Sequence, residues 1–263
     1  MPLDLDLALD TARRAVDAAA RASLAHFRRG VRVEVKPDRT PVTAADRDAE
    51  GAILAVLREA FPGHAVLGEE TGAHAGSEPS RWIVDPIDGT RGFTRGGAFW
   101  GALVALEHAG EVVVGAMALP ALGETYWAAR GRGAWMARGG EPPSPLQVSG
   151  VGDWAEATLS LGEFRGLFVP GRDRRLLDLS LSAAQARCYG DLAGAAMVLQ
   201  GRAEAWVEAG VKVWDIAPLQ VLAEEAGGRF TDLAGASTVE SGNYLLSNGR
   251  VHDHVLRALG RPD

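Results

Sequence analysis

The ten residues from Arg81 to Thr90, Arg-Trp-Ile-Val-Asp-Pro-Ile-Asp-Gly-Thr, constrain this chain more than any other stretch. Their apolar run predicts a buried strand. Asp85 and Asp88 follow at the end of that strand, and the proline between them interrupts regular structure, so both carboxylates can face a cleft. Gly89 permits a tight turn, and Thr90 is a suitable N-cap for a short helix whose first N–H groups bind anions. Carboxylates for a hard cation beside donors for a phosphate suggest metal-assisted phosphate chemistry, although the short Asp-Pro-Ile-Asp-Gly run by itself fits an ordinary turn equally well.

Length and composition exclude several classes of protein. The 263 residues allow one large domain or two small ones, with enough core to fold without disulfides or a structural metal. A formal net charge of −7, with no cluster of Lys and Arg interleaved with aromatics, argues against a nucleic-acid partner. The single cysteine, Cys188, excludes a disulfide framework and a cysteine-based zinc site. No stretch has the length and apolarity of a signal peptide or a membrane span, so we expect a cytoplasmic protein without a membrane partner.

The first half of the chain predicts two helices and a series of strands. An amphipathic helix is expected over 3–29 and a second one from about 42 to 60. Thr43 is a good N-cap for the second helix, and the dipole favours Asp46 in its first turn, which explains Asp46 without any function. Strands are expected over 31–35, 64–67, 82–84, 103–106, 112–116 and 126–129.

The second half alternates between strands and helices. Three prolines and two glycines between 136 and 149 mark the expected boundary between two subdomains, about 1–147 and 148–263. Strands are expected over 158–162, 203–208, 229–232 and 244–247. Helices are expected over 172–184, 192–201, 215–226 and 251–259.

Other catalytic signatures find little support. The Gly-Arg-Gly at 131–133 lacks the strand–helix–strand context of a dinucleotide site. A Gly-x-Ser-x-Gly elbow is absent from the sequence, which removes support for a serine nucleophile. His252 and His254 are two positions apart, so on a helix they point in different directions and are poor candidates for a metal site.

Five segments, taken in order, resemble the inositol monophosphatase family. They are Val42-Thr-Ala-Ala-Asp46, Leu67-Gly-Glu-Glu70, Trp82 to Thr90, Val213-Trp-Asp-Ile-Ala-Pro218 and Glu224-Glu-Ala-Gly-Gly228. The similarity covers nearly the whole chain, from the first helix to Ser247-Asn-Gly249. It implies a single domain of the α/β (α+β) class with the family's layered αβαβα fold. The metal and phosphate site would lie in the first subdomain, and the substrate-specificity side and last metal ligand in the second.

The resemblance also implies a Mg²⁺-dependent phosphomonoesterase. The family's metal ligands, which would hold two or three ions, correspond to Glu69, Asp85, the backbone carbonyl of Ile87, Asp88 and Asp215. Carboxylates gathered in one cleft would repel each other strongly without cations, which supports a metal independently.

The same resemblance assigns the catalytic groups. Thr90 and Asp46 would orient the attacking water, and the N–H groups of Gly89 and Thr90 would hold the phosphate. Glu70 would assist the metal ligands or bind an additional ion. Lys36 falls in the family's mobile loop near the site. A homodimer is the family's usual state.

Substrate choice is expected to depend on the second half. In family members that act on inositol, the residue corresponding to Glu208 contacts substrate hydroxyls. Here the run Arg187-Cys-Tyr-Gly-Asp191 resembles the histidinol-phosphatase branch instead, as do Arg91-Gly-Phe93, 99–106 and 126–134. Asp191 and Glu208 would pair with the ammonium and imidazole groups of histidinol phosphate, with Arg187 as a further substrate-binding candidate.

Two observations weaken that assignment. Asp191 is equally suited to be an N-cap of the following Ala-rich helix. The branch often has an aromatic residue or a cysteine shortly after this aspartate, whereas here the run is Leu192-Ala-Gly-Ala195. We therefore expect hydrolysis of L-histidinol phosphate, with inositol-1-phosphate next and then a nucleoside or sugar bisphosphate. A non-catalytic homologue is the remaining alternative, and the presence of every expected metal ligand counts against it.

Overall fold

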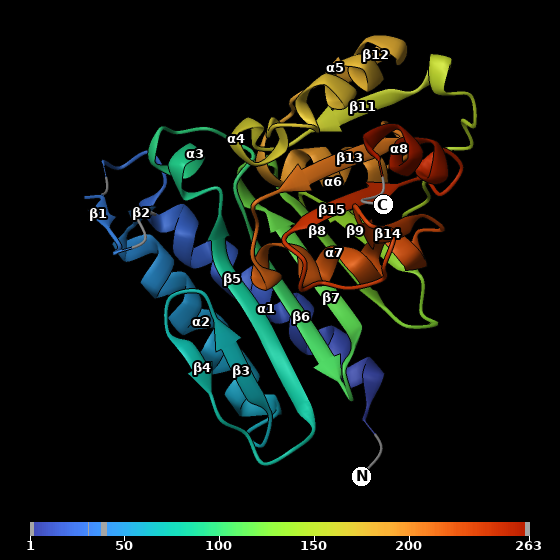
Figure 1. The fold of residues 1–263 in the computed structure, drawn as a ribbon. Coiled ribbons are helices and arrows are strands. Elements are labelled where there is room, and N and C mark those ends of the chain that lie inside the picture. The colour runs from blue at the N-terminus through green and yellow to red at the C-terminus, as the bar shows by residue number, and fades with distance from the viewer. Residues whose placement is uncertain (1–2, 31, 38–40, 261–263) are drawn as a thin grey trace.

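The computed structural model describes residues 3–30, 32–37 and 41–260. Two sheets and three helical layers alternate through the molecule (Figure 1). The eight-stranded sheet has the order β10-β9-β8-β7-β6-β5-β3-β4, and the five-stranded sheet the order β12-β11-β13-β15-β14. A separate two-stranded ribbon, β1-β2, precedes the strands of the eight-stranded sheet in the sequence. The layered αβαβα fold expected from the sequence is confirmed.

The first helical layer and the first sheet are built from the N-terminal half. Its helices are α1 Leu5–His26, α2 Ala44–Ala60 and α3 Thr90–Thr94. Its strands are β1 Glu34–Val35, β2 Pro41–Val42, β3 Ala65–Gly68, β4 Gly72–His74, β5 Ser80–Asp88, β6 Gly101–His108, β7 Glu111–Leu119, β8 Glu124–Ala129, β9 Ala134–Arg138 and β10 Ser144–Pro145. The helices α1 and α2 pack on each other and cover one face of the large sheet.

The C-terminal half supplies the other layers. Its helices are α4 Phe164–Leu167, α5 Asp173–Ser182, α6 Asp191–Leu199, α7 Val213–Glu225 and α8 His252–Leu259. Its strands are β11 Thr158–Leu161, β12 Gln185–Arg187, β13 Ala205–Ala209, β14 Arg229–Asp232 and β15 Asn243–Ser247. The helices α6 and α7 lie between the two sheets, and α5 and α8 cover the outer face of the small sheet. Because α7 packs on both sheets, it joins the two halves, and the proposed subdomain division stays a prediction.

Strand β5 is buried on both faces, as its continuous apolar run predicted. Trp82 packs into the core beneath α1 and α2, whereas Ile83 packs into the core beneath α6 and α7. The strand continues through Pro86 to Asp88, so the expectation that it ends before the proline is wrong. The pairing of β5 with β6 shifts register between Asp85 and Asp88. This bulge lies at Pro86, which has no backbone N–H to donate to the neighbouring strand.

Four local expectations need correction. The N-cap of α3 is Gly89, with a left-handed φ of 78°, and Thr90 is the first helical residue rather than the cap. The N-cap of α6 is Gly190, and Asp191 makes no side-chain capping bond. The first helix ends at His26 instead of residue 29, and Arg28 takes a positive φ of 58°. The strand expected over 31–35 is seen only at Glu34–Val35, and Val31 lies outside the described residues.

Across the described ranges, no helix is long and apolar enough to cross a bilayer.

Candidate active site

Three carboxylates meet where β5 ends and α7 begins. Asp85, Asp88 and Asp215 each place one oxygen so that all three atoms lie within 4.8 Å of one another. The Oδ1 atom of Asp85 accepts the Ile87 N–H at 2.9 Å, within the bulge near the end of β5. The Oδ2 atom of Asp215 accepts the Lys212 N–H at 2.8 Å, which fixes this carboxylate in the first turn of α7. Backbone donors therefore hold two of the three side chains in place.

The electrostatics of this cluster require compensation. Burial raises the pKa of Asp85 and of Asp88 well above the ordinary range, and neighbouring carboxylates, among them Asp215, raise them further. Burial likewise raises the pKa of Asp215 to about 6. A divalent cation would offset this repulsion, and a site of carboxylate oxygens alone suits a hard ion such as Mg²⁺. The donors present thus fit the metal that the sequence predicted.

The turn that carries Glu69 and Glu70 lies beside the cluster. The Glu69 N–H donates to Val84 O at 3.2 Å, which ties the turn to β5. Lys36 Nζ lies 2.9 Å from Glu69 Oε1 and 2.7 Å from Glu70 Oε1, so it bridges the two carboxylates. Burial raises the pKa of Glu70 to about 7. The structure therefore places Glu69, Glu70 and Lys36 together, as the resemblance implied.

Glu50 supports this turn and was missed by the sequence analysis. It is fully buried in α2, and its carboxylate accepts the N–H groups of Glu70 and Thr71, both at 2.9 Å. The Thr71 hydroxyl donates to it as well, at 2.5 Å. A signal was present in the sequence, because Glu50 falls on the apolar stripe of its helix, four residues after Asp46 and three before Ile53.

Asp46 and Thr90 are in contact, although they lie far apart in the sequence. Thr90 Oγ1 lies 3.2 Å from Asp46 Oδ1 and 3.1 Å from the carbonyl oxygen of Ile87. The other Asp46 oxygen accepts the backbone N–H and the hydroxyl of Thr43, each at 2.7 Å. Asp46 is fully buried, and burial raises its pKa. The Asp46 side chain thus both caps α2 and holds the Thr90 hydroxyl. Thr43 is confirmed as the N-cap of α2.

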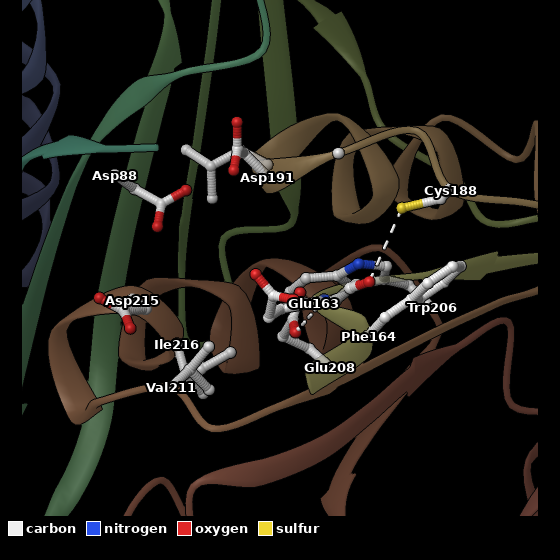
Figure 2. Close-up of a pocket in the computed structure, with 13 residues that line it drawn as sticks. Asp88, Glu163, Phe164, Cys188, Asp191, Trp206, Glu208, Val211, Asp215 and Ile216 are labelled. Carbon is white, nitrogen blue, oxygen red and sulfur yellow. Dashed lines mark hydrogen bonds between the residues drawn. The ribbon is translucent and has the colours of Figure 1, made fainter. Parts of the chain in front are cut away.

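A cavity of about 490 Å³ opens next to this cluster (Figure 2). Its carboxylate-bearing residues are Asp88, Glu163, Asp191, Glu208 and Asp215. Apolar side chains complete the wall, namely Phe164, Leu192, Trp206, Val211 and Ile216. Within the described part of the chain, no lysine, arginine or histidine lines it. The cavity is therefore suited to a positively charged group.

The two predicted substrate-binding carboxylates both reach this cavity. Glu208 Oε1 accepts the N–H groups of Glu163 and Ala209, both at 2.9 Å, and burial raises the pKa of Glu208 to about 7. Asp191 lies against the turn after β5, since a Cβ atom added to Gly89 would be 2.7 Å from Asp191 Oδ2. Burial raises the pKa of Asp191 as well, and Glu163 adds to the effect.

Arg187 does not join them. Its side chain is exposed at the edge of the small sheet, where it donates to the carbonyl oxygen of Ala186 at 2.8 Å. Conversely, Glu163, Phe164 and Trp206 line the cavity without having been singled out. No local signal marks them, because each lies on a different stretch from the recognised motifs and meets the cavity only through packing.

The sequence profile of the inositol monophosphatase family matches residues 4–261. The histidinol-phosphatase of Mycobacterium tuberculosis is 41% identical over 256 residues, covering 97% of each chain. The histidinol-phosphatase of Chlorobaculum parvum is 37% identical over 262 residues, covering 99% of this chain and 98% of that protein. The inositol-1-monophosphatase of Mesorhizobium japonicum is 33% identical over 243 residues, covering 88% and 87%. Among solved structures, the Thermotoga maritima IMPase superposes with a TM-score of 0.82 at 30% identity, covering 97% and 96%.

Proposed function

This chain belongs to the inositol monophosphatase family and is a phosphoric monoester hydrolase, and from that premise we propose that it hydrolyses L-histidinol phosphate to L-histidinol and phosphate. The cavity beside the acidic cluster carries the proposal. Its wall combines several carboxylates with apolar side chains, and no basic residue of the described chain lines it. Such a cavity favours a leaving group with positive charge, and histidinol has an ammonium group and a titratable imidazole. The names of the Mycobacterium tuberculosis and Chlorobaculum parvum relatives support the same substrate.

Magnesium is the proposed cofactor. Two ions would be held by the carboxylates of Glu69, Asp85, Asp88 and Asp215 and by the carbonyl oxygen of Ile87, and Glu70 would assist these ligands or bind a third ion. When bound, magnesium would polarise the phosphate, lower the pKa of the attacking water and neutralise charge on the leaving oxygen. The raised pKa values of Asp85 and Asp88 support this assignment, since buried carboxylates of like charge call for a cation.

The protein's own groups would position the reactants. Asp46 accepts the Thr90 hydroxyl at 3.2 Å, so this pair can fix a water molecule for attack on phosphorus. The N–H groups of Gly89, whose φ is 78°, and of Thr90 would hold the phosphate oxygens. Any side chain at position 89 would clash with Asp191. Glycine therefore suits this position for lack of a side chain as well as for its positive φ.

Asp191 and Glu208 would bind the leaving group. Asp191 lies beside the phosphate-binding turn, so it can reach the ammonium on the carbon adjacent to the ester-bearing one. Glu208 is buried in the same cavity, and its Oε1 atom is fixed by two backbone donors, which leaves Oε2 for the ligand. Ion pairing with a buried carboxylate such as Glu208 would contribute more than the same pairing at the surface.

The test is phosphate release with Mg²⁺ from histidinol phosphate and inositol-1-phosphate side by side. We expect kcat/KM to favour histidinol phosphate by roughly a hundredfold or more, because inositol has no charge to pair with the carboxylates. Equal rates, or a preference for inositol-1-phosphate, would refute the proposed substrate and support the activity named for the Mesorhizobium relative. EDTA should abolish the activity, and added Mg²⁺ should restore it.

Three further assignments follow from the same proposal. The enzyme would act in histidine biosynthesis, in the cytoplasm, and as the homodimer usual for its family. Sedimentation equilibrium of the purified protein tests the last of these.

A further inference from the structure

The cavity has two ends with different chemistry. Figure 2 shows Asp88 and Asp215 on one side and Phe164, Trp206 and Cys188 on the other, with Asp191 and Glu208 between them. The end near Asp88 and Asp215 belongs to the acidic cluster already described. The opposite end is formed by the start of α4, where Glu163 is the N-cap and Phe164 the first helical residue.

Glu163 caps α4 with only one of its two carboxylate oxygens. Its Oε1 atom caps α4 by accepting the Arg165 N–H at 3.0 Å, and its backbone N–H supports Glu208. In the described part of the chain no lysine, arginine or histidine forms an ion pair with Glu163. It is close enough to Asp191 for its negative charge to raise the pKa of that carboxyl group. Glu163 is exposed and lines the cavity, so its unpaired charge is available to a ligand there.

Phe164 presents an aromatic face beside this charge. Its side chain is 52% exposed although it lines the cavity, and it packs edge-on against Phe168 with ring centroids 5.0 Å apart. An exposed aromatic ring is unfavourable in water unless something covers it. A flat cationic ring would satisfy both residues, because it can stack on Phe164 and donate an N–H to Glu163.

We propose that Glu163 and Phe164 form a specificity subsite for the imidazole end of the substrate. This inference rests on the proposed function. Asp191 lies against the Gly89 turn, Glu163 and Glu208 lie next to each other across the cavity from Asp191, and Phe164 lies beyond them (Figure 2). Phosphate, ammonium and ring follow in the same order along histidinol phosphate, so one extended ligand can satisfy all of them.

The test separates the ring from the rest of the substrate. Histidinol phosphate is compared with 2-aminoethyl phosphate, which keeps the phosphate and the ammonium and lacks the ring. In Glu163→Gln the new side chain still offers an oxygen to the Arg165 N–H, so α4 keeps its cap and only the charge is lost. We expect KM for histidinol phosphate to rise about tenfold, as for loss of a partly exposed charge-assisted hydrogen bond, with kcat changed less than about twofold. KM for 2-aminoethyl phosphate should stay within about twofold of the wild-type value.

Two matched controls accompany this variant. Glu111→Gln removes a charge from an exposed position at the start of β7, outside the cavity, and should leave both substrates unaffected. Phe164→Leu should raise KM for histidinol phosphate about fivefold, whereas Phe168→Leu, whose ring does not line the cavity, should not.

The outcomes distinguish the two proposals. If the wild-type enzyme does not hydrolyse histidinol phosphate, the proposed function fails and the subsite fails with it. If the wild-type enzyme does so but Glu163→Gln changes neither substrate, or both equally, only the subsite is refuted. Where 2-aminoethyl phosphate is turned over too slowly to measure, its inhibition constant against histidinol phosphate replaces KM.

Discussion

Replacing Glu50 by glutamine tests whether a buried carboxylate of α2 holds the turn that carries Glu69 and Glu70 in shape. One Glu50 oxygen accepts the Thr71 N–H and hydroxyl, and the other accepts the Glu70 N–H. Glutamine keeps one oxygen and replaces the other by an NH₂ group, so at least one backbone donor would face another donor. The site leaves no room for adjustment, because a Cβ atom on Gly68 would already lie 2.5 Å from Glu50 Oε1.

The magnitude follows from that count of hydrogen bonds. One lost hydrogen bond with an unsatisfied buried donor lowers the free energy of unfolding by about 1–3 kcal/mol, and we expect about 2 kcal/mol for Glu50→Gln. The turn also carries Glu69 and Glu70, so its displacement should weaken Mg²⁺ binding. Residues that orient metal ligands from outside typically change metal affinity by about 10–100-fold when mutated, and the lower half of that range is expected here.

Two measurements check this prediction. Urea denaturation in EDTA gives the free energy of unfolding without metal, and calorimetric titration with Mg²⁺ gives the affinity. The control is Glu59→Gln on the same helix, whose side chain is 74% exposed and pairs with Arg14 at 3.3 Å, so its effect should stay below about 0.5 kcal/mol. The reasoning would be refuted if Glu50→Gln matched this control in both stability and Mg²⁺ affinity.

Three other changes give separate predictions. Asp88→Asn should lower kcat/KM at least about a hundredfold, yet the melting temperature in EDTA should not fall, because burial and neighbouring carboxylates raise the Asp88 pKa and its charge is unfavourable without metal; wild-type turnover would contradict its role as a ligand. His252 is fully buried. Burial is the main cause that lowers its pKa to about 4, so the side chain is neutral in the folded state at neutral pH. Its stabilising contribution is complete above the unfolded pKa of about 6.5 and is lost as the pH falls toward 4, by up to about 3 kcal/mol, so urea denaturation at pH 7.5 and pH 5 should show a steeper loss for wild type than for His252→Asn. Gly162→Ala would place a Cβ atom 1.7 Å from Glu208 Oε2 and should raise KM for histidinol phosphate about tenfold, whereas Gly150→Ala, with nothing within 4 Å, should not; equal KM values would mean that the Glu208 position does not affect substrate binding.

The sequence was sufficient where one continuous stretch builds a feature. The apolar run before Asp85 predicted a buried strand, and the family resemblance carried by the five ordered motifs implied the fold and the acidic cluster. The sequence could not fix the exact ends of elements. Gly89 is the N-cap of α3 where Thr90 was expected, because a left-handed φ at the cap suits glycine and not threonine.

Tertiary structure decided which residues far apart in the chain meet. The sequence left Asp191 equally suited to a helix cap and to a ligand contact, and packing of α6 against the Gly89 turn directs its carboxylate to the cavity instead. Arg187 belongs to the same short run yet points to solvent at the sheet edge. Glu163 reaches the cavity because β11 and β13 pair in parallel, which brings the start of α4 next to Glu208.

The physical reason for this division is the range of the forces involved. Spacing and capping act over a few residues, so the sequence by itself determined the strands, the helices and the ligand motif at the end of β5. The shape and charge of a cavity depend on how whole layers pack, which is set by many weak contacts between distant segments. The sequence thus indicated that this chain carries a metal-assisted phosphatase motif, and only the fold decided which carboxylates line the cavity beside it.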